Sequence, residues 1–125
     1  MAAAAFVVNG GVGIIPNRMR GTGTEPTWVG WGTGATTAAK ADTGLQTASA
    51  EARVSGTTTS QTTTNTGDTW QNVATITSAS AQTIQEVACF DAVSSGTCFM
   101  HATHGAQTLA INDAIQYTIK VQFVN

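Results

Sequence analysis

The two histidines of the chain, His101 and His104, are the first candidates for a chemical site, because they form a His-x-x-His pair. Paired histidines are common zinc ligands. The pair lies in a segment that reads as a strand, where side chains i and i+3 point to opposite faces. No third histidine exists, and no carboxylate is close in the sequence. We therefore predict structural or interface histidines and no bound metal or cofactor. The alternative is a pair on a loop, completed by neighbouring copies.

The two cysteines, Cys89 and Cys98, flank a predicted hairpin turn. If Asp91 faces Gly96 across a four-residue loop, the cysteines lie directly opposite each other on paired strands. Cross-strand cysteines can be close enough to form a disulfide. The N-terminus lacks the features of a signal peptide, which predicts a reducing compartment. We therefore expect two buried, reduced thiols that lie near each other.

The seven carboxylates are scattered and form no recognisable catalytic or calcium-binding motif. Four of them lie beside turn signals, where an aspartate accepts hydrogen bonds from the local backbone. These four are Asp42, Asp68, Asp91 and Asp113. We expect no enzymatic activity, since a catalytic site needs several titratable groups close together. The remaining enzymatic alternative is a metal-dependent hydrolase that uses His101 and His104.

The composition narrows the class of partner. Only 10% of the 125 residues are charged, and only five are Lys or Arg. No basic patch is visible, which argues against nucleic acid and against an anionic membrane surface. No segment is apolar over the length of a membrane span. A surface with few charges and many threonines suits a protein that is docked on neighbouring subunits.

The periodicity predicts an all-β fold. Five core-facing residues alternate with polar ones near the C-terminus: Ile115, Tyr117, Ile119, Val121 and Phe123. This period of two is typical of a half-buried strand. Further strands are expected over 51–64, 69–77, 83–91 and 97–103. A short strand is expected around Trp28 and Trp31, and residues 36–45 could form one helical turn. We predict an antiparallel β-sandwich or jelly roll that forms a single domain over residues 23–125.

Residues 1–22 differ from this pattern. Their apolar residues are separated by Gly10, Gly11 and Gly13, a spacing that argues against a stable helix. We therefore expect an extended N-terminal arm that packs on a partner. Its binding residues would be Phe6, Val7, Val8, Val12, Ile14, Ile15, Arg18 and Arg20.

Two stretches carry a resemblance to a known family. The first is WVGWGTGATTAAKADTGL, with Gly32 to Gly34, Asp42 and Leu45. The second is the hairpin TWQNVATITSASAQTIQEVACFDAVSSGTCFMH, with the pattern formed by Ile84, Glu86, Phe90, Asp91, Ala92 and Gly96. Over roughly residues 28–124 the chain resembles small virion structural proteins of tailed phages, among which the hairpin occurs in both head-decorating and tail-associated proteins.

The resemblance implies an antiparallel β fold without enzymatic activity. Together with the sequence it predicts a capsid decoration, or cement, protein on the outer surface of a phage head, made in the host cytoplasm. Its partners would be the major capsid protein and copies of itself, expected as a homotrimer. The alternative is a tail-associated module, such as a fibre tip or baseplate piece, that binds a host receptor.

Overall fold

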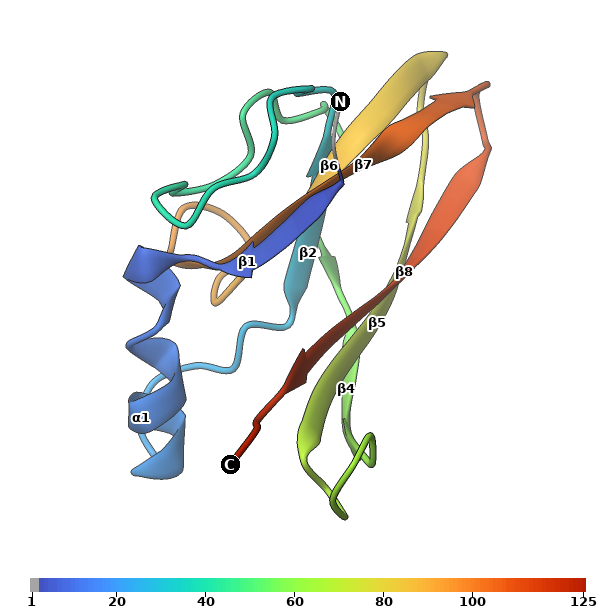
Figure 1. Ribbon diagram of the computed structural model, residues 1–125. Coiled ribbons are helices and arrows are strands. Elements are labelled where there is room, and N and C mark those ends of the chain that lie inside the picture. Colours follow the sequence, from blue (N-terminus) through green and yellow to red (C-terminus); the bar gives the residue numbers. More distant parts are fainter. Residues whose placement is uncertain (1–2) are drawn as a thin grey trace.

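The computed structural model describes residues 3–125 and shows two antiparallel sheets (Figure 1). The five-stranded sheet has the order β1-β7-β6-β2-β3, and the three-stranded sheet has the order β4-β5-β8. The elements are β1 (Ala4–Val7), the 3-10 helix η1 (Asn9–Gly11), α1 (Ile14–Met19), β2 (Trp28–Gly32), β3 (Val54–Ser55), β4 (Thr57–Gln61), β5 (Thr69–Thr77), β6 (Gln82–Phe90), β7 (Cys98–Leu109) and β8 (Ala114–Gln122). The predicted all-β, sandwich-like single domain is confirmed.

The alternating pattern at the C-terminus forms β8, which pairs with β5 over nine residues without a bulge. Ile119 is buried between the sheets, and Tyr117 and Val121 are half-buried beside it. The prediction that Phe123 faces the core is wrong, because Phe123 lies beyond the end of β8 and is 49% exposed. The backbone leaves the sheet where Phe123 N–H donates to Asp68 O at 2.9 Å, so the alternation stops one residue earlier than the sequence suggested.

The two sheets are joined at three places. Residues 78–81 link β5 to β6 and residues 110–113 link β7 to β8, and these two crossings bind each other through Ser78 N–H to Asp113 O at 2.7 Å. The third crossing is Gly56 between β3 and β4, where a Cβ would collide with the Asn72 side chain. The crossing at Gly56 places β3 and β4 on one side of the sandwich, and β1 and β8 are therefore the edges of the opposite side.

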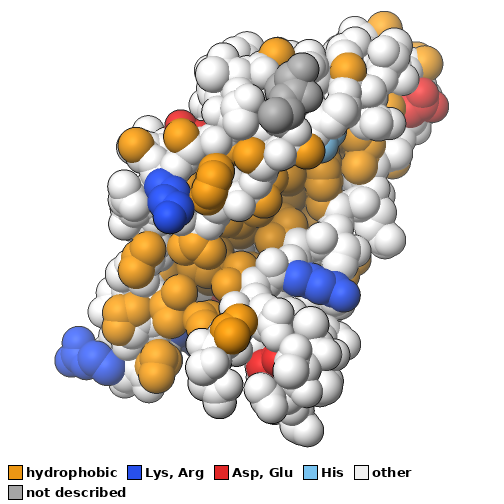
Figure 2. Space-filling model, viewed as in Figure 1, with side chains coloured by type: hydrophobic (Ala, Val, Ile, Leu, Met, Phe, Trp, Pro, Cys, Tyr) orange, Lys and Arg blue, Asp and Glu red, His pale blue; other side chains and the backbone are white. Residues whose placement is uncertain are grey.

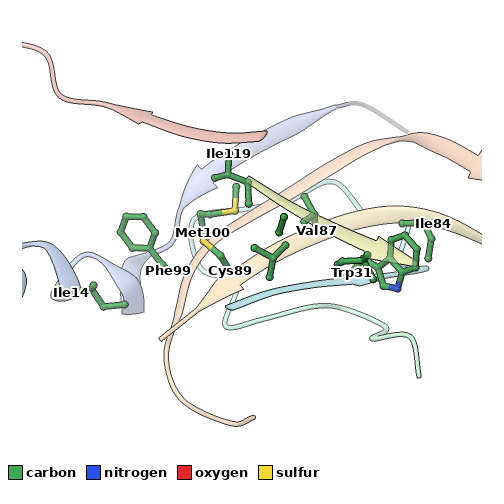
Figure 3. Close-up of a cluster of buried hydrophobic side chains, with 11 residues drawn as sticks. Ile14, Trp31, Ile84, Val87, Cys89, Phe99, Met100 and Ile119 are labelled. Atoms are coloured by element: carbon green, nitrogen blue, oxygen red, sulfur yellow. The ribbon is translucent and has the colours of Figure 1, made fainter. Parts of the chain in front are cut away.

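The main core lies between the sheets (Figure 3). Phe99 and Ile14 lie at one end of the cluster, and Trp31 and Ile84 lie at the other. Trp31 is 2% exposed and belongs to this core, and Trp28 is half-buried. The aromatic rings of Trp70 on β5 and Phe99 on β7 meet edge to face, with centroids 5.5 Å apart.

The outer face of the five-stranded sheet is covered by the long segment between β2 and β3, residues 33–53. Leu45 from this segment packs on a second buried cluster, which includes Ala88 and Phe90. The helical turn predicted within 36–45 is wrong, because this stretch contains only turns and bends. The side chains of β6 and β7 are consequently buried on both faces near the middle of the sheet.

The N-terminal segment packs on its own chain, which differs from the predicted arm that packs on a partner. β1 pairs with β7, Val8 is fully buried, and Val8 N–H donates to Phe99 O at 3.0 Å. Gly11 lies directly on the backbone of β7, with no space for a Cβ beside Phe99. The expectation of no helix is also wrong, because the short helix α1 follows despite the glycines. Val7, Val8, Ile14 and Ile15 of this segment pack against apolar residues of the same chain.

None of the helices in the described part of the chain is long and apolar enough to cross a membrane.

We expect Val8→Ala to lower the free energy of unfolding by about 1.5–3 kcal/mol, because Val8 is fully buried. The matched control is Val12→Ala, four residues further on, where the side chain is 50% exposed and the change should stay within about 0.5 kcal/mol. Urea unfolding of both variants measures the difference. Equal stabilities would mean that the segment is loose in the free subunit, as the sequence had suggested.

Candidate functional site

The most concentrated group of polar contacts surrounds Glu86, which is fully buried in the middle of β6. Its Oε2 accepts hydrogen bonds from the backbone N–H groups of Gly34 at 2.9 Å and Thr47 at 2.8 Å. Its Oε1 accepts one from Gln46 N–H at 2.8 Å and lies 2.8 Å from His101 Nε2. One carboxylate thereby holds both ends of the covering segment against the sheet.

His101 lies between two carboxylates. Its ring contacts Glu86 through Nε2 and Asp42 Oδ2 through Nδ1, the latter at 2.6 Å. Asp42 Oδ2 also accepts the N–H of Ala39, as an ionised carboxylate would. Each ring nitrogen of His101 therefore lies within hydrogen-bonding distance of a carboxylate oxygen. We name Asp42, Glu86 and His101 the acid–His cluster, in which Glu86 and His101 are fully buried and Asp42 is half-buried.

The glycines that sequence analysis singled out make room for this cluster. A Cβ at Gly32 would lie 2.6 Å from Glu86 Oε2, and a Cβ at Gly34 would lie 2.4 Å from the same atom. Neither position could accept a larger residue without displacing the carboxylate. The Gly-x-Gly pattern thus serves close approach to a buried side chain.

The acid–His cluster has the components of a general acid–base site but lacks access. Both Glu86 and His101 are 0% exposed. The two carboxylate oxygens of Glu86 and the two ring nitrogens of His101 all have hydrogen-bond partners within the chain. No group of three or more His, Cys, Asp or Glu residues within 3–125 is arranged to hold a metal ion. The geometry supports a structural role, in which the cluster fastens residues 34–47 to the sheet.

The two histidines do not act together. Both lie on β7, as predicted, but His104 is half-buried and contacts Tyr117 OH through Nε2 at 2.9 Å. The alternative of a histidine pair on a loop is therefore wrong.

The four turn aspartates behave as the sequence predicted. Each accepts at least one backbone N–H in its own turn. The donors are Ala39 for Asp42, Thr63 to Asn65 for Asp68, Thr97 for Asp91 and Ala110 for Asp113. The turn at Asp91 is also held by Arg53, which lies over the ring of Phe90 and donates to the carbonyls of Ala92 and Ser95.

The cysteines are free and buried, but they are not opposite each other. Cys89 pairs with Met100 and Phe90 pairs with Cys98, because a β-bulge inserts Phe99 between the two pairs. The predicted four-residue loop is therefore wrong. Burial raises the pKa of Cys98 to about 12 and raises the pKa of Cys89 well above the ordinary value. Neither thiol is an activated nucleophile.

The residues predicted to bind a partner divide into three groups. Val8 and Ile14 are buried, whereas Phe6, Val7 and Ile15 are half-buried. Val12, Arg18 and Arg20 are exposed.

A hollow of about 270 Å³ lies where α1 faces β5 and the C-terminus. We name it the apolar hollow, and its lining is mostly apolar: Ile14, Ile15, Met19, Pro26, Trp70, Phe99 and Phe123, with Arg18 and Glu25. Figure 2 shows an apolar depression that runs between the N-terminal segment and β8, with basic side chains on both sides of it. Sequence analysis named Ile14, Ile15 and Arg18 but missed the other six, of which Trp70, Phe99 and Phe123 come from distant parts of the chain.

Comparison of the chain with known protein families, with curated proteins and with solved structures found no match. The resemblance to phage virion proteins therefore stays a prediction.

The acid–His cluster predicts how stability depends on pH. Burial alone would raise the pKa of Asp42, but the hydrogen bond from Ala39 and the hydrogen bond and charge of His101 hold that pKa below its ordinary value. A carboxyl whose pKa is lowered by folding adds stability above its unfolded-state pKa, and this contribution is lost as the pH falls through the folded-state pKa. We expect the free energy of unfolding to decrease below about pH 4.

Asp42→Asn should be less stable than the parent at neutral pH and should lose less stability on acidification. Urea unfolding at stepwise pH measures this. Asp113→Asn, which changes an exposed turn carboxylate, is the control and should keep the parent's slope. Parallel profiles for Asp42→Asn and the parent would contradict a charged role for Asp42.

Proposed function

We propose that this chain is a non-enzymatic structural protein of a phage particle, a capsid decoration (cement) protein on the outer surface of the head. It would bridge subunits of the major capsid protein and contact copies of itself, expected as a trimer. The observation that carries the proposal is the apolar hollow, which lies on the open side of a scaffold whose carboxylates accept internal hydrogen bonds.

The use of the charged side chains supports a structural role. All seven carboxylates accept hydrogen bonds from the chain itself. Beyond the acid–His cluster and the turn aspartates, Glu25 accepts from Trp70 and Glu51 accepts from Trp31 and Gln82. Each carboxylate thus has at least one oxygen engaged with the backbone or with another side chain of the fold. The titratable groups therefore hold the fold together.

The shape of the surface supports attachment to another protein. An apolar depression bordered by sheet edges offers both buried area and unpaired backbone groups, which is what a subunit needs to bind a neighbour. The low charge over the rest of the surface suits close packing in a lattice of subunits.

Addition of the purified protein to phage heads that lack it tests the proposal. We expect co-sedimentation with the heads that saturates, and electron microscopy that places the protein on the outer surface of the shell. Absence from heads together with binding to intact host cells would favour the tail-associated module instead. Absence from both would overturn the proposal of a virion protein that attaches to the shell.

A further inference from the structure

Within residues 3–125 the outer edge of β8 is unpaired, and Lys120 is the only feature of this strand that would protect it against pairing. β8 is hydrogen-bonded to β5 on one side only, and it forms the edge of its sheet. It runs for nine residues without proline or bulge, and Lys120 is its only charged residue. Edge strands that must stay free usually carry several charges, prolines or bulges. This edge is therefore suited to accept another strand.

The apolar surface beside this edge is incomplete. Ile115, Tyr117 and Val121 point toward the core but are only half-buried, whereas Ile119 between them is 5% exposed. The depression continues from these residues into the apolar hollow, where Met19 is 84% exposed. An extended segment with apolar side chains at alternate positions would pair with β8 and cover both areas.

The charges around the depression indicate what such a segment carries. The side chains of Arg20, Lys40 and Lys120 form no hydrogen bond or ion pair within the part of the chain that the structure describes. Arg20 directly follows α1 at the apolar hollow, and Lys120 lies on β8. Arg18 and Glu25, which line the hollow, carry opposite charges and are each engaged in an internal hydrogen bond. The unpaired charges that remain near the depression are therefore positive, although the chain has a net charge of −2. A segment with carboxylates would complement them.

A second copy of this chain does not meet that requirement. A strand added to β8 from a second copy would have to be one of the edge strands β1, β3, β4 or β8, and none of these contains an Asp or a Glu. The occupant is better supplied by a different protein.

We propose that the depression between β8 and α1 binds an extended, acidic segment of a partner protein, added as a strand along the edge of β8 with its apolar side chains in the hollow. The source of this segment rests on the proposed function, in which the partner is the shell protein of the head.

The first experiment uses a defined probe. It is a peptide as long as β8, nine residues, in which valine alternates with threonine and both ends carry glutamates. The comparison peptide has lysines in place of the glutamates. Titration of the full chain by NMR should move the amide signals of α1 and β8, and the glutamate peptide should bind about tenfold more tightly.

Two variants make the site specific. Phe123→Glu should weaken binding of the glutamate peptide by about tenfold or more, because it adds a negative charge and removes an apolar side chain from the hollow. Ile111→Glu is the matched control, since Ile111 is a similarly exposed apolar residue in the turn after β7 and should leave binding unchanged. Both substitutions are at exposed positions, and thermal melts verify that the fold is retained.

The inference is overturned if neither peptide binds, if both bind equally, or if the shifts lie outside α1 and β8. It is also overturned if the chain alone forms dimers that Phe123→Glu disrupts, because a second copy would then be the occupant. Sedimentation with heads separates this inference from the proposed function. Equal attachment of the parent and Phe123→Glu to heads would refute the binding site but retain the proposed function. Specific peptide binding without attachment to heads would retain the binding site but refute the proposed function.

Discussion

The structure depends most on the burial of one carboxylate. Glu86 sits at 0% exposure in a sheet whose outer face is covered by a segment without regular secondary structure. Leaving a charge in such a place is costly unless it is paired and hydrogen-bonded. Three backbone N–H groups and the ring of His101 meet that cost, and all three N–H groups belong to the covering segment. The segment therefore takes its position from the carboxylate.

This arrangement divides the molecule into a closed side and an open side. On the outer face of the five-stranded sheet, the acid–His cluster and Leu45 seal the surface. Between the sheets, the crossing at Gly56 closes one edge, and the edges formed by β1 and β8 are left without a covering element. The apolar hollow opens on the side of β1 and β8, and the free basic side chains include Arg20 and Lys120 near it. A partner would thus meet a rigid framework with one apolar, weakly cationic opening.

Local signals predicted the parts of the fold that depend on neighbouring residues. The alternation in β8 and the turn aspartates follow from period and from short-range hydrogen bonds, so both could be read from the sequence. The bulge at Phe99 could not, because it depends on how β6 and β7 are matched, and it moved Cys98 away from Cys89. The acid–His cluster joins residues separated by 15 and 59 positions, so no local pattern shows it, although its glycines and its glutamate stood out as a motif. The N-terminal residues were known to need apolar partners, but only the three-dimensional arrangement shows that β7 supplies them.

The central claim is that Glu86 is the structural fastener of the covering segment, and the unfolding of Glu86→Gln tests it most directly. Glutamine keeps the size but turns an amide NH₂ toward groups that donate, so the free energy of unfolding should fall by about 3–5 kcal/mol. Hydrogen exchange of the amides at 34, 46 and 47 should accelerate at the same time. The matched control is Glu25→Gln, which keeps an oxygen acceptor for Trp70 in a half-buried place and should cost less than about 1 kcal/mol. If Glu86→Gln were as stable as Glu25→Gln and the exchange of those amides were unchanged, the account would be contradicted.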